Sequence, residues 1–485
     1  MRKQSGTTAR PGAALAVLAG AQFTVMLATS IVNVALPQIR SGVGLTESGT
    51  TWVVNAYGLA FGALLLAGGR AADLLGRRRI LLAGLGLFGA ASLAAGLSTT
   101  STALITARAA QGVGAAAIAP AALALVMDVF PPGPGRGRAL GVWGAVSGAG
   151  GAAGVLLGGV LTQAWGWRWI FHAVAIGTFL VLIATAAYVP RAPGTERGRF
   201  DLLGTATVSL ALTALVWGLT SARRTGWTDT QVLGAFALAA VLLVVFVLVE
   251  RRHPNPLLPP RLFRTGRVAA GNVLMALFGS VWIALFFFLP LYQQQVLGSS
   301  PLVTGLGQLP LAGANMLGST LAPRISRRIG ATATVTAALL AEAGGMLWLS
   351  RISAHGSYLT DVLGPSVLIG LGLSIAFVQL TALSVEGVPQ TDTGLAGGLV
   401  NTTRQVGGAI GLAVLTTLAA SVTAAAPGPH LDALTSGYRT AFAIAAAVIT
   451  ATALLTPVLA RRGRPRGPTA ESAHPKQAAS FTRTS

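Results

Sequence analysis

The chain has 485 residues, of which 53% are hydrophobic and only 10% are charged, and its formal net charge is +21. The apolar residues fall in long continuous blocks, which is the composition of a membrane protein and excludes an ordinary soluble domain. The chain contains no cysteine, which excludes disulfides, thiol catalysis and cysteine-ligated metals.

The apolar blocks predict an all-α integral membrane protein, because a hydrocarbon core about 30 Å thick needs roughly 20 apolar residues in each helix. Strands of a membrane barrel would alternate apolar and polar residues, whereas residues 241–249 are apolar on every side. Fourteen transmembrane helices are predicted, near residues 13–36, 50–68, 80–98, 103–127, 139–161, 169–189, 202–220, 231–249, 268–291, 302–322, 331–349, 362–384, 394–421 and 438–460.

The positive charges predict how these spans are oriented. With the amino terminus in the cytoplasm, 26 of the 34 lysines and arginines lie on cytoplasmic connectors or tails, and six lie on the other side. This bias satisfies the positive-inside rule, so we interpret the charge as a topology signal and a contact with anionic lipids, not with nucleic acid. No small-residue cleavage site follows the first apolar block, which we interpret as span one and not as a signal peptide.

Two basic connectors divide the predicted spans into groups of six, two and six. The predicted segments are a cytoplasmic tail at 1–12, a six-helix bundle at 13–190, two linker helices with basic cytoplasmic loops at 191–267, a second six-helix bundle at 268–460 and a disordered cytoplasmic tail at 461–485.

The connector after the second span, GGRAADLLGRRRI, concentrates charge in a chain that has little of it. A sharp turn between helices needs glycine, and a carboxylate there can pair with arginine or with a helix amino terminus. Arginines that only fix topology are the alternative, although topology alone requires neither the aspartate nor the glycines. The residues of this motif are Gly69, Asp73, Gly76, Arg77, Arg78 and Arg79.

Two further motifs follow in spans four and five. Arg108 lies inside span four, where a central arginine costs about 2.5 kcal/mol or more and is expected to face a wet cavity or a partner; snorkelling to the surface is the alternative. Glycines repeat through span five, where small residues let helices approach closely, as suits a seam that must seal and slide, or serves close packing alone. These glycines are Gly141, Gly150, Gly154, Gly158 and Gly159.

These motifs, with SIVNVALPQI in span one and NTTRQVGGAIG in span thirteen, resemble the fourteen-span drug/proton antiporters of the major facilitator superfamily over nearly the whole chain. The resemblance implies the major facilitator fold, with two six-helix bundles and two extra central helices. It also implies a bacterial multidrug or antibiotic exporter of the cytoplasmic membrane, working by alternating access.

The resemblance assigns roles to several residues. It implies a latch on the cytoplasmic face, in which Asp73 would face the start of span thirteen and Arg77 would pair with Asp128 at the inner end of span four. It associates Arg108 with proton transfer. Two positions depart from the family pattern, because Val155 replaces the proline of the span-five signature and Ala28 stands where many members carry an aspartate.

Proton coupling requires a group that gains and releases a proton, usually a carboxylate within the membrane. Glu342 is the acid that the predicted spans place near mid-bilayer, although its helix corresponds to a peripheral one in the family and a structural role is the alternative. Protonation of the latch would offer another route without an acid in the substrate cavity. The coupling candidates are therefore Arg108, Asp73 and Glu342.

The substrate cavity follows from the helices that face inward in the family. Aromatic faces with a few amides suit a large amphipathic organic molecule, and Arg404 favours an anionic or acidic group; a hydrogen bond between helices is the alternative for each residue. The candidates are Asn33, Asn55, Tyr57, Gln111, Asn272, Trp282, Tyr292, Gln293, Gln308, Asn315, Gln379, Asn401, Arg404 and Gln405.

The sequence therefore predicts a monomeric exporter of drug-like or antibiotic-like molecules that is driven by the proton gradient and needs no cofactor or metal. An uncoupled or differently coupled exporter is the alternative, motivated by Ala28 and Val155. A membrane enzyme is disfavoured, because the five histidines are scattered and no nucleophile or metal-site spacing is present. A non-transporting receptor would need a soluble domain, which no connector is long enough to hold.

Overall fold

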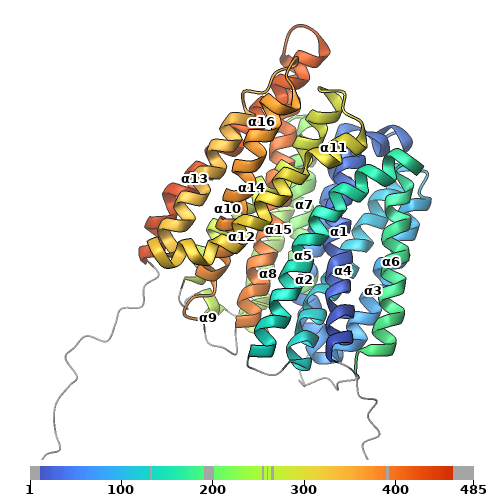
Figure 1. Ribbon diagram of the computed structural model, residues 1–485, viewed down its shortest axis with the longest axis vertical. Coiled ribbons are helices and arrows are strands. Elements are labelled where there is room, and N and C mark those ends of the chain that lie inside the picture. The colour runs from blue at the N-terminus through green and yellow to red at the C-terminus, as the bar shows by residue number, and fades with distance from the viewer. Residues whose placement is uncertain are drawn as a thin grey trace, which may run out of the picture.

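The computed structural model describes residues 11–130, 134–190, 201–253, 256–258, 260–263, 267–388 and 393–462. Within these ranges the chain is helical throughout and contains no strand, which confirms the all-α membrane architecture. The helices stand roughly side by side in one elongated bundle (Figure 1). In that view α1 begins and α16 ends at the lower end, which we name the terminal end; the other is the opposite end.

Each of the fourteen predicted spans corresponds to a helix or a pair of consecutive helices. The helices of the first half are α1 (Pro11–Gly42), α2 (Glu47–Leu75), α3 (Arg77–Leu97), α4 (Ser101–Val129), α5 (Pro134–Trp165) and α6 (Arg168–Tyr188). The linker helices are α7 (Leu202–Thr225) and α8 (Thr230–Arg252). After the short α9 (Pro260–Phe263) come α10 (Val268–Gln295), α11 (Pro301–Gly307), α12 (Leu309–Ile329), α13 (Ala331–Leu349), the π-helical turn η1 (Tyr358–Leu363), α14 (Gly364–Ser384), α15 (Thr393–Ala425) and α16 (His430–Arg462).

Local sequence signals explain where several helices begin and end. The side chains of Thr46 and Thr100 cap α2 and α4 by accepting a backbone N–H from the first turn. Gly76 separates α2 from α3 with a φ of 102°, a conformation that side-chain-bearing residues rarely adopt. Predicted span ten is broken at Gln308 into α11 and α12, because Pro310 in the first turn of α12 has no N–H to continue the preceding helix.

Twelve helices of the described chain are long and apolar enough to cross a membrane by length and composition. Predicted spans five and ten, now α5 and α11–α12, lie outside this set. The end of α12 carries Arg324, Arg327 and Arg328, which lowers its hydropathy. Most of both predicted tails lies outside the described residues, although α16 continues to Arg462; the division of the chain into segments remains a prediction.

The helices pack most closely within each half of the bundle. In the first half α2 and α3 pack on α4, and α1 packs on α5; in the second, α10 packs on α15 and α14 packs on α12 and α13. The halves meet along α2 with α15, α1 with α10, and α5 with α11. The linker helix α7 packs on both α2 and α15 and so bridges the interface between the halves.

Candidate functional site

The latch motif forms an ion-pair cluster at the terminal end of the first half. Arg77 donates from Nε and NH2 to Asp73 Oδ1, at 3.1 and 3.0 Å, and from NH1 to Asp128 Oδ1 at 2.5 Å. Arg78 donates to the carbonyls of Val189 and Ala186, which ties the start of α3 to the end of α6. Arg77 thus joins its own helix, α3, to α2 and α4.

Two further residues of the latch motif, Gly69 and Arg79, have different surroundings. Gly69 packs on the ring of Pro120 in α4, and the exposed side chain of Arg79 lies outside the cluster. Asp73 accepts hydrogen bonds from Arg77, and its expected approach to the start of span thirteen remains a prediction.

Substitution of Arg77 by glutamine is expected to shift the balance between the two access states. A partly exposed ion pair contributes about 1 kcal/mol at most, so each of Arg77→Gln and Asp128→Asn should change that balance about fivefold. Cysteines introduced into this cysteine-free chain would report it through their labelling rates. The matched control is Arg79→Gln; an equal shift in the control would contradict a specific role for the cluster.

Arg108 is buried inside the first half, with 1% of its surface exposed. Its Nε donates to Val53 O at 2.9 Å and its NH1 to Gln111 Oε1 at 2.8 Å. Its guanidinium carbon lies 4.4 Å from the centre of the Tyr57 ring. Gln111 in turn donates to Ser92 Oγ at 2.7 Å. The side chain is therefore directed at partners in α2 and α4, and the snorkelling alternative is wrong.

The Tyr57 hydroxyl extends this network to α1. It donates to Val25 O at 3.1 Å and accepts from Thr29 Oγ1 at 3.2 Å. Gly112 permits the close approach of α4 to α2, because a Cβ there would lie 2.5 Å from Tyr57 O. Ala28, which replaces the acid common in the family, is buried in the core of this half. Arg108 thus organises four helices without a carboxylate at position 28.

The span-five glycines serve two different contacts. A Cβ added at Gly150, Gly154 or Gly158 would lie 3.0 Å or less from atoms of α1, so these residues seat α5 against α1. A Cβ at Gly159 would lie 2.5 Å from a carbonyl oxygen of α11, in the other half. Gly141 lies nearer the start of α5. The motif therefore provides packing within one half and a close seam between the halves.

Arg404 lies on α15 in the second half. Its NH2 donates to Asn401 Oδ1 at 2.8 Å, and its guanidinium carbon lies 5.2 Å from the Trp282 ring centre and 5.7 Å from that of Phe377. Phe278 completes an aromatic cluster contributed by α10 and α14. The guanidinium therefore sits against aromatic faces and keeps donors available for an anionic group.

Several predicted cavity residues bury polar atoms that find no hydrogen-bond partner among the described residues. Such atoms are costly unless a ligand or water satisfies them. They are Asn33 Oδ1, Asn55 Oδ1, Gln293 Nε2, Gln308 Oε1 and Nε2, and Arg404 Nε. These atoms lie on α1, α2, α10 and α15 and on Gln308 between α11 and α12, all of which contact the other half.

Other predicted cavity residues are engaged in helix packing. Tyr292 donates to Ser353 O or Asp361 Oδ2, each at 2.9 Å. Asn272 donates to Val268 O and accepts from Thr403, and Gln379 donates to Ala322 O. Gln405 is buried, and Asn315 is partly exposed on α12. Sequence reasoning missed Gln294, which donates to Val34 O at 2.7 Å and joins α10 to α1.

Glu342 is fully buried on α13, away from the interface between the halves. Neither of its carboxylate oxygens has a hydrogen-bond partner in the described part of the chain. A Cβ at Gly372 of α14 would lie 3.0 Å from Glu342 Cβ, so the two helices are in close contact here. Ionising an unpartnered carboxyl group in such surroundings is costly, whereas the neutral acid is tolerated.

A bundle of membrane helices in two halves, with buried arginines and unpaired polar atoms on helices of both, is the architecture of a solute transporter. The sequence model of the Major Facilitator Superfamily matches residues 18–412, and the chain belongs to this family. It is therefore a multi-pass membrane transporter and not an enzyme.

Relatives with named activities match most of the chain. It is 40% identical over 469 residues to the cephamycin export protein of Amycolatopsis lactamdurans, covering 96% of each chain. It is 40% identical to the puromycin resistance protein of Streptomyces alboniger, over 92% of this chain and 90% of the relative. A crystal structure of an auto-inhibited peptide transporter of the POT family has a TM-score of 0.69 at 14% identity, over 95% of this chain and 98% of that one, and shows the fold alone.

Proposed function

We propose that this protein exports antibiotic-like or drug-like organic molecules across the cytoplasmic membrane of a bacterium by alternating access. The observation that carries the proposal is the set of buried, unpaired polar atoms on helices of both halves, together with Arg404 against Trp282 and Phe377. Such a surface suits an amphipathic molecule with an aromatic or apolar body and an acidic group. The named export and resistance proteins that the chain resembles support the same conclusion.

The distribution of positive charge supports a cytoplasmic terminal end. Arg77, Arg78 and Arg79 lie there, as do Arg327 and Arg328 at the end of α12. By the positive-inside rule, both termini are then cytoplasmic and the basic connectors contact anionic lipid head groups. We propose a monomer that works without a cofactor.

We further propose that export is coupled to proton entry, with Asp73, Arg108 and Glu342 as the residues through which protonation acts. The unpartnered carboxyl group of Glu342 supports a site that holds a proton in one state of the cycle. The ion pairs of Asp73 with Arg77 support a latch that protonation would weaken. An exporter without proton coupling remains the second candidate, since Ala28 replaces the usual acid.

Export is tested by expressing the chain in a sensitive host against cephamycin, puromycin, tetracenomycin C and lincomycin, the compounds in the names of its relatives. We expect tolerance of at least one compound to rise clearly above that of a host expressing Arg108→Leu. No rise for any compound would contradict the exporter.

Coupling is tested with inverted vesicles whose interior is acidified. Adding the exported compound should dissipate the acid interior, and Glu342→Gln should abolish this response while leaving downhill exchange of the compound intact. Equal transport with the gradient collapsed would leave export standing and overturn the proton coupling.

A further inference from the structure

A cleft opens between the two halves at the opposite end of the bundle. It lies between α1 and α2 on one side and α10, α15 and α16 on the other. Its cavity volume is about 80 Å³. Leu36, Phe287, Phe288 and Leu291 provide apolar and aromatic surface in it. This volume is below the roughly 300–1,000 Å³ of pockets that enclose a whole drug-sized ligand, so the cleft has room for a head group and leaves the rest of the ligand outside.

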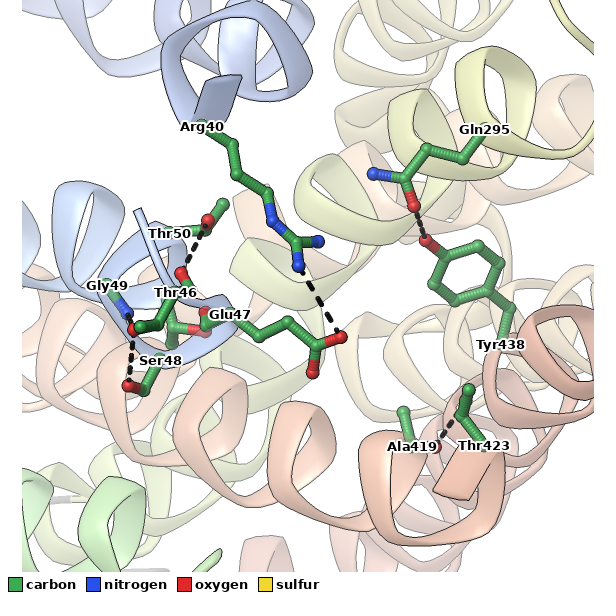
Figure 2. Close-up of polar contacts among 11 residues, drawn as sticks. Arg40, Thr46, Glu47, Ser48, Gly49, Thr50, Gln295, Ala419, Thr423 and Tyr438 are labelled. Atoms are coloured by element: carbon green, nitrogen blue, oxygen red, sulfur yellow. Dashed lines mark hydrogen bonds and ion pairs between the residues drawn. The ribbon is translucent and has the colours of Figure 1, made fainter. Parts of the chain in front are cut away.

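Arg40 at the end of α1 and Glu47 at the start of α2 carry the formal charges of the cleft lining. Arg40 NH2 lies 3.8 Å from Glu47 Oε1, and the two side chains are 41% and 43% exposed. Figure 2 shows them directed toward each other, with Tyr438 and Gln295 on another wall. A long, exposed pair contributes about 0.2–1 kcal/mol, so a ligand that offers both charges can replace it at little cost.

Other polar groups of the cleft are already hydrogen-bonded. The hydroxyls of Thr50, Thr416 and Thr423 donate to carbonyls of their own helices or to the cap residue before them. Tyr438 donates to Gln295 Oε1 at 2.7 Å. The electrostatic character of the cleft is therefore set by the Arg40 and Glu47 charges.

The cleft lies in line with the candidate site in the interior. Thr51 and Thr416 belong to its lining, and Asn55, one turn further along α2, donates to Ala409 O of α15 at 3.4 Å. This long hydrogen bond joins the halves between the cleft and Arg404.

We propose that this cleft is a second binding site for the exported compound and that it selects a zwitterionic head group. The carboxylate of the ligand pairs with Arg40, its ammonium group pairs with Glu47, and its apolar body packs on Phe287 and Phe288. An anion or a cation alone can engage only one of these two side chains. This inference rests on the proposed direction of export, which makes the cleft the last site before release.

The test uses the purified full chain in nanodiscs of phosphatidylglycerol, which contain no zwitterionic lipid. The probe is Nε-dansyl-lysine, whose fluorescence rises in apolar surroundings, compared with its α-N-acetyl derivative, an anion, and its α-carboxamide, a cation. We expect the zwitterion to bind at least about fivefold more tightly than either derivative. Equal affinities for the three probes would overturn the proposal.

Variants of Arg40 and Glu47 test whether this charge pair binds the zwitterionic probe. Arg40→Gln and Glu47→Gln should each weaken binding of the zwitterion about threefold to fivefold, and exchanging the two charges in Arg40→Glu with Glu47→Arg should restore it. Arg351→Gln, which removes an exposed charge at the same end, should have no effect. Unchanged affinity in the single variants, or no recovery in the exchanged one, would overturn the assignment. Because binding of the probe does not require transport, it can be measured even if the export test fails. The failure of one proposal can therefore be told apart from the failure of the other.

Discussion

Replacing Arg108 with leucine is expected to lower export about a hundredfold, because hydrogen bonds from a charged group contribute about 1.5–3 kcal/mol each. Two such bonds, to Val53 O and Gln111 Oε1, are lost together with the contact to the Tyr57 ring. The initial rate of export from vesicles with matched protein content measures the effect. The melting temperature of the purified protein should fall as well, since the carbonyl and amide are left buried without their partner.

Arg108→Lys is the control that separates the loss of export from the loss of stability. Lysine keeps the charge but cannot reproduce the planar fork that reaches Val53 O and Gln111 Oε1 together. We expect it to recover much of the melting temperature and little of the export. Recovery of both in parallel would show that Arg108 only holds the helices together and takes no part in the transport cycle.

Much of the helical scaffold could be predicted, because an apolar stretch of sufficient length has few alternatives in a membrane. The pairing of Arg77 with Asp128 was implied by resemblance, and the structure places these side chains together. The break at Gln308 was missed, although Gly305, Gly307 and Pro310 around it are the signal that marks such a break.

Contacts between the halves were much harder to predict. Membrane helices are apolar on all sides, so their sequence periodicity does not show which face meets which neighbour. The bond from Gln294 to Val34 O depends on how α10 docks on α1, and the same holds for Arg40 and Glu47 around the cleft. The glycine motif of span five predicted close packing, but its division between α1 and α11 appears only in the folded chain.

Because Gly158 contacts α1 and Gly159 contacts α11, alanine substitutions at these two adjacent residues are expected to have different consequences. In Gly159→Ala the new methyl group would lie 2.5 Å from Pro301 O and 3.2 Å from Leu302 Cα, across the seam between the halves. Overpacking of this kind costs about 1–3 kcal/mol, and a change of state that separates α5 from α11 relieves it. We therefore expect the balance between access states to shift about thirtyfold toward opening at the opposite end.

Gly158→Ala is the matched control, because its methyl group would lie 2.5 Å from Ile31 O within the first half, where no change of state relieves it. It should lower the melting temperature and leave the balance between states unchanged. Spin labels are attached at Trp165→Cys and Leu359→Cys, which are exposed sites at the opposite end of the two halves. Pulsed electron paramagnetic resonance then measures the distance between the two labels. A longer distance is expected in the Gly159 variant alone. The same distance in both variants, with equal loss of stability, would mean that α5 and α11 stay together throughout the transport cycle and that the seam is static.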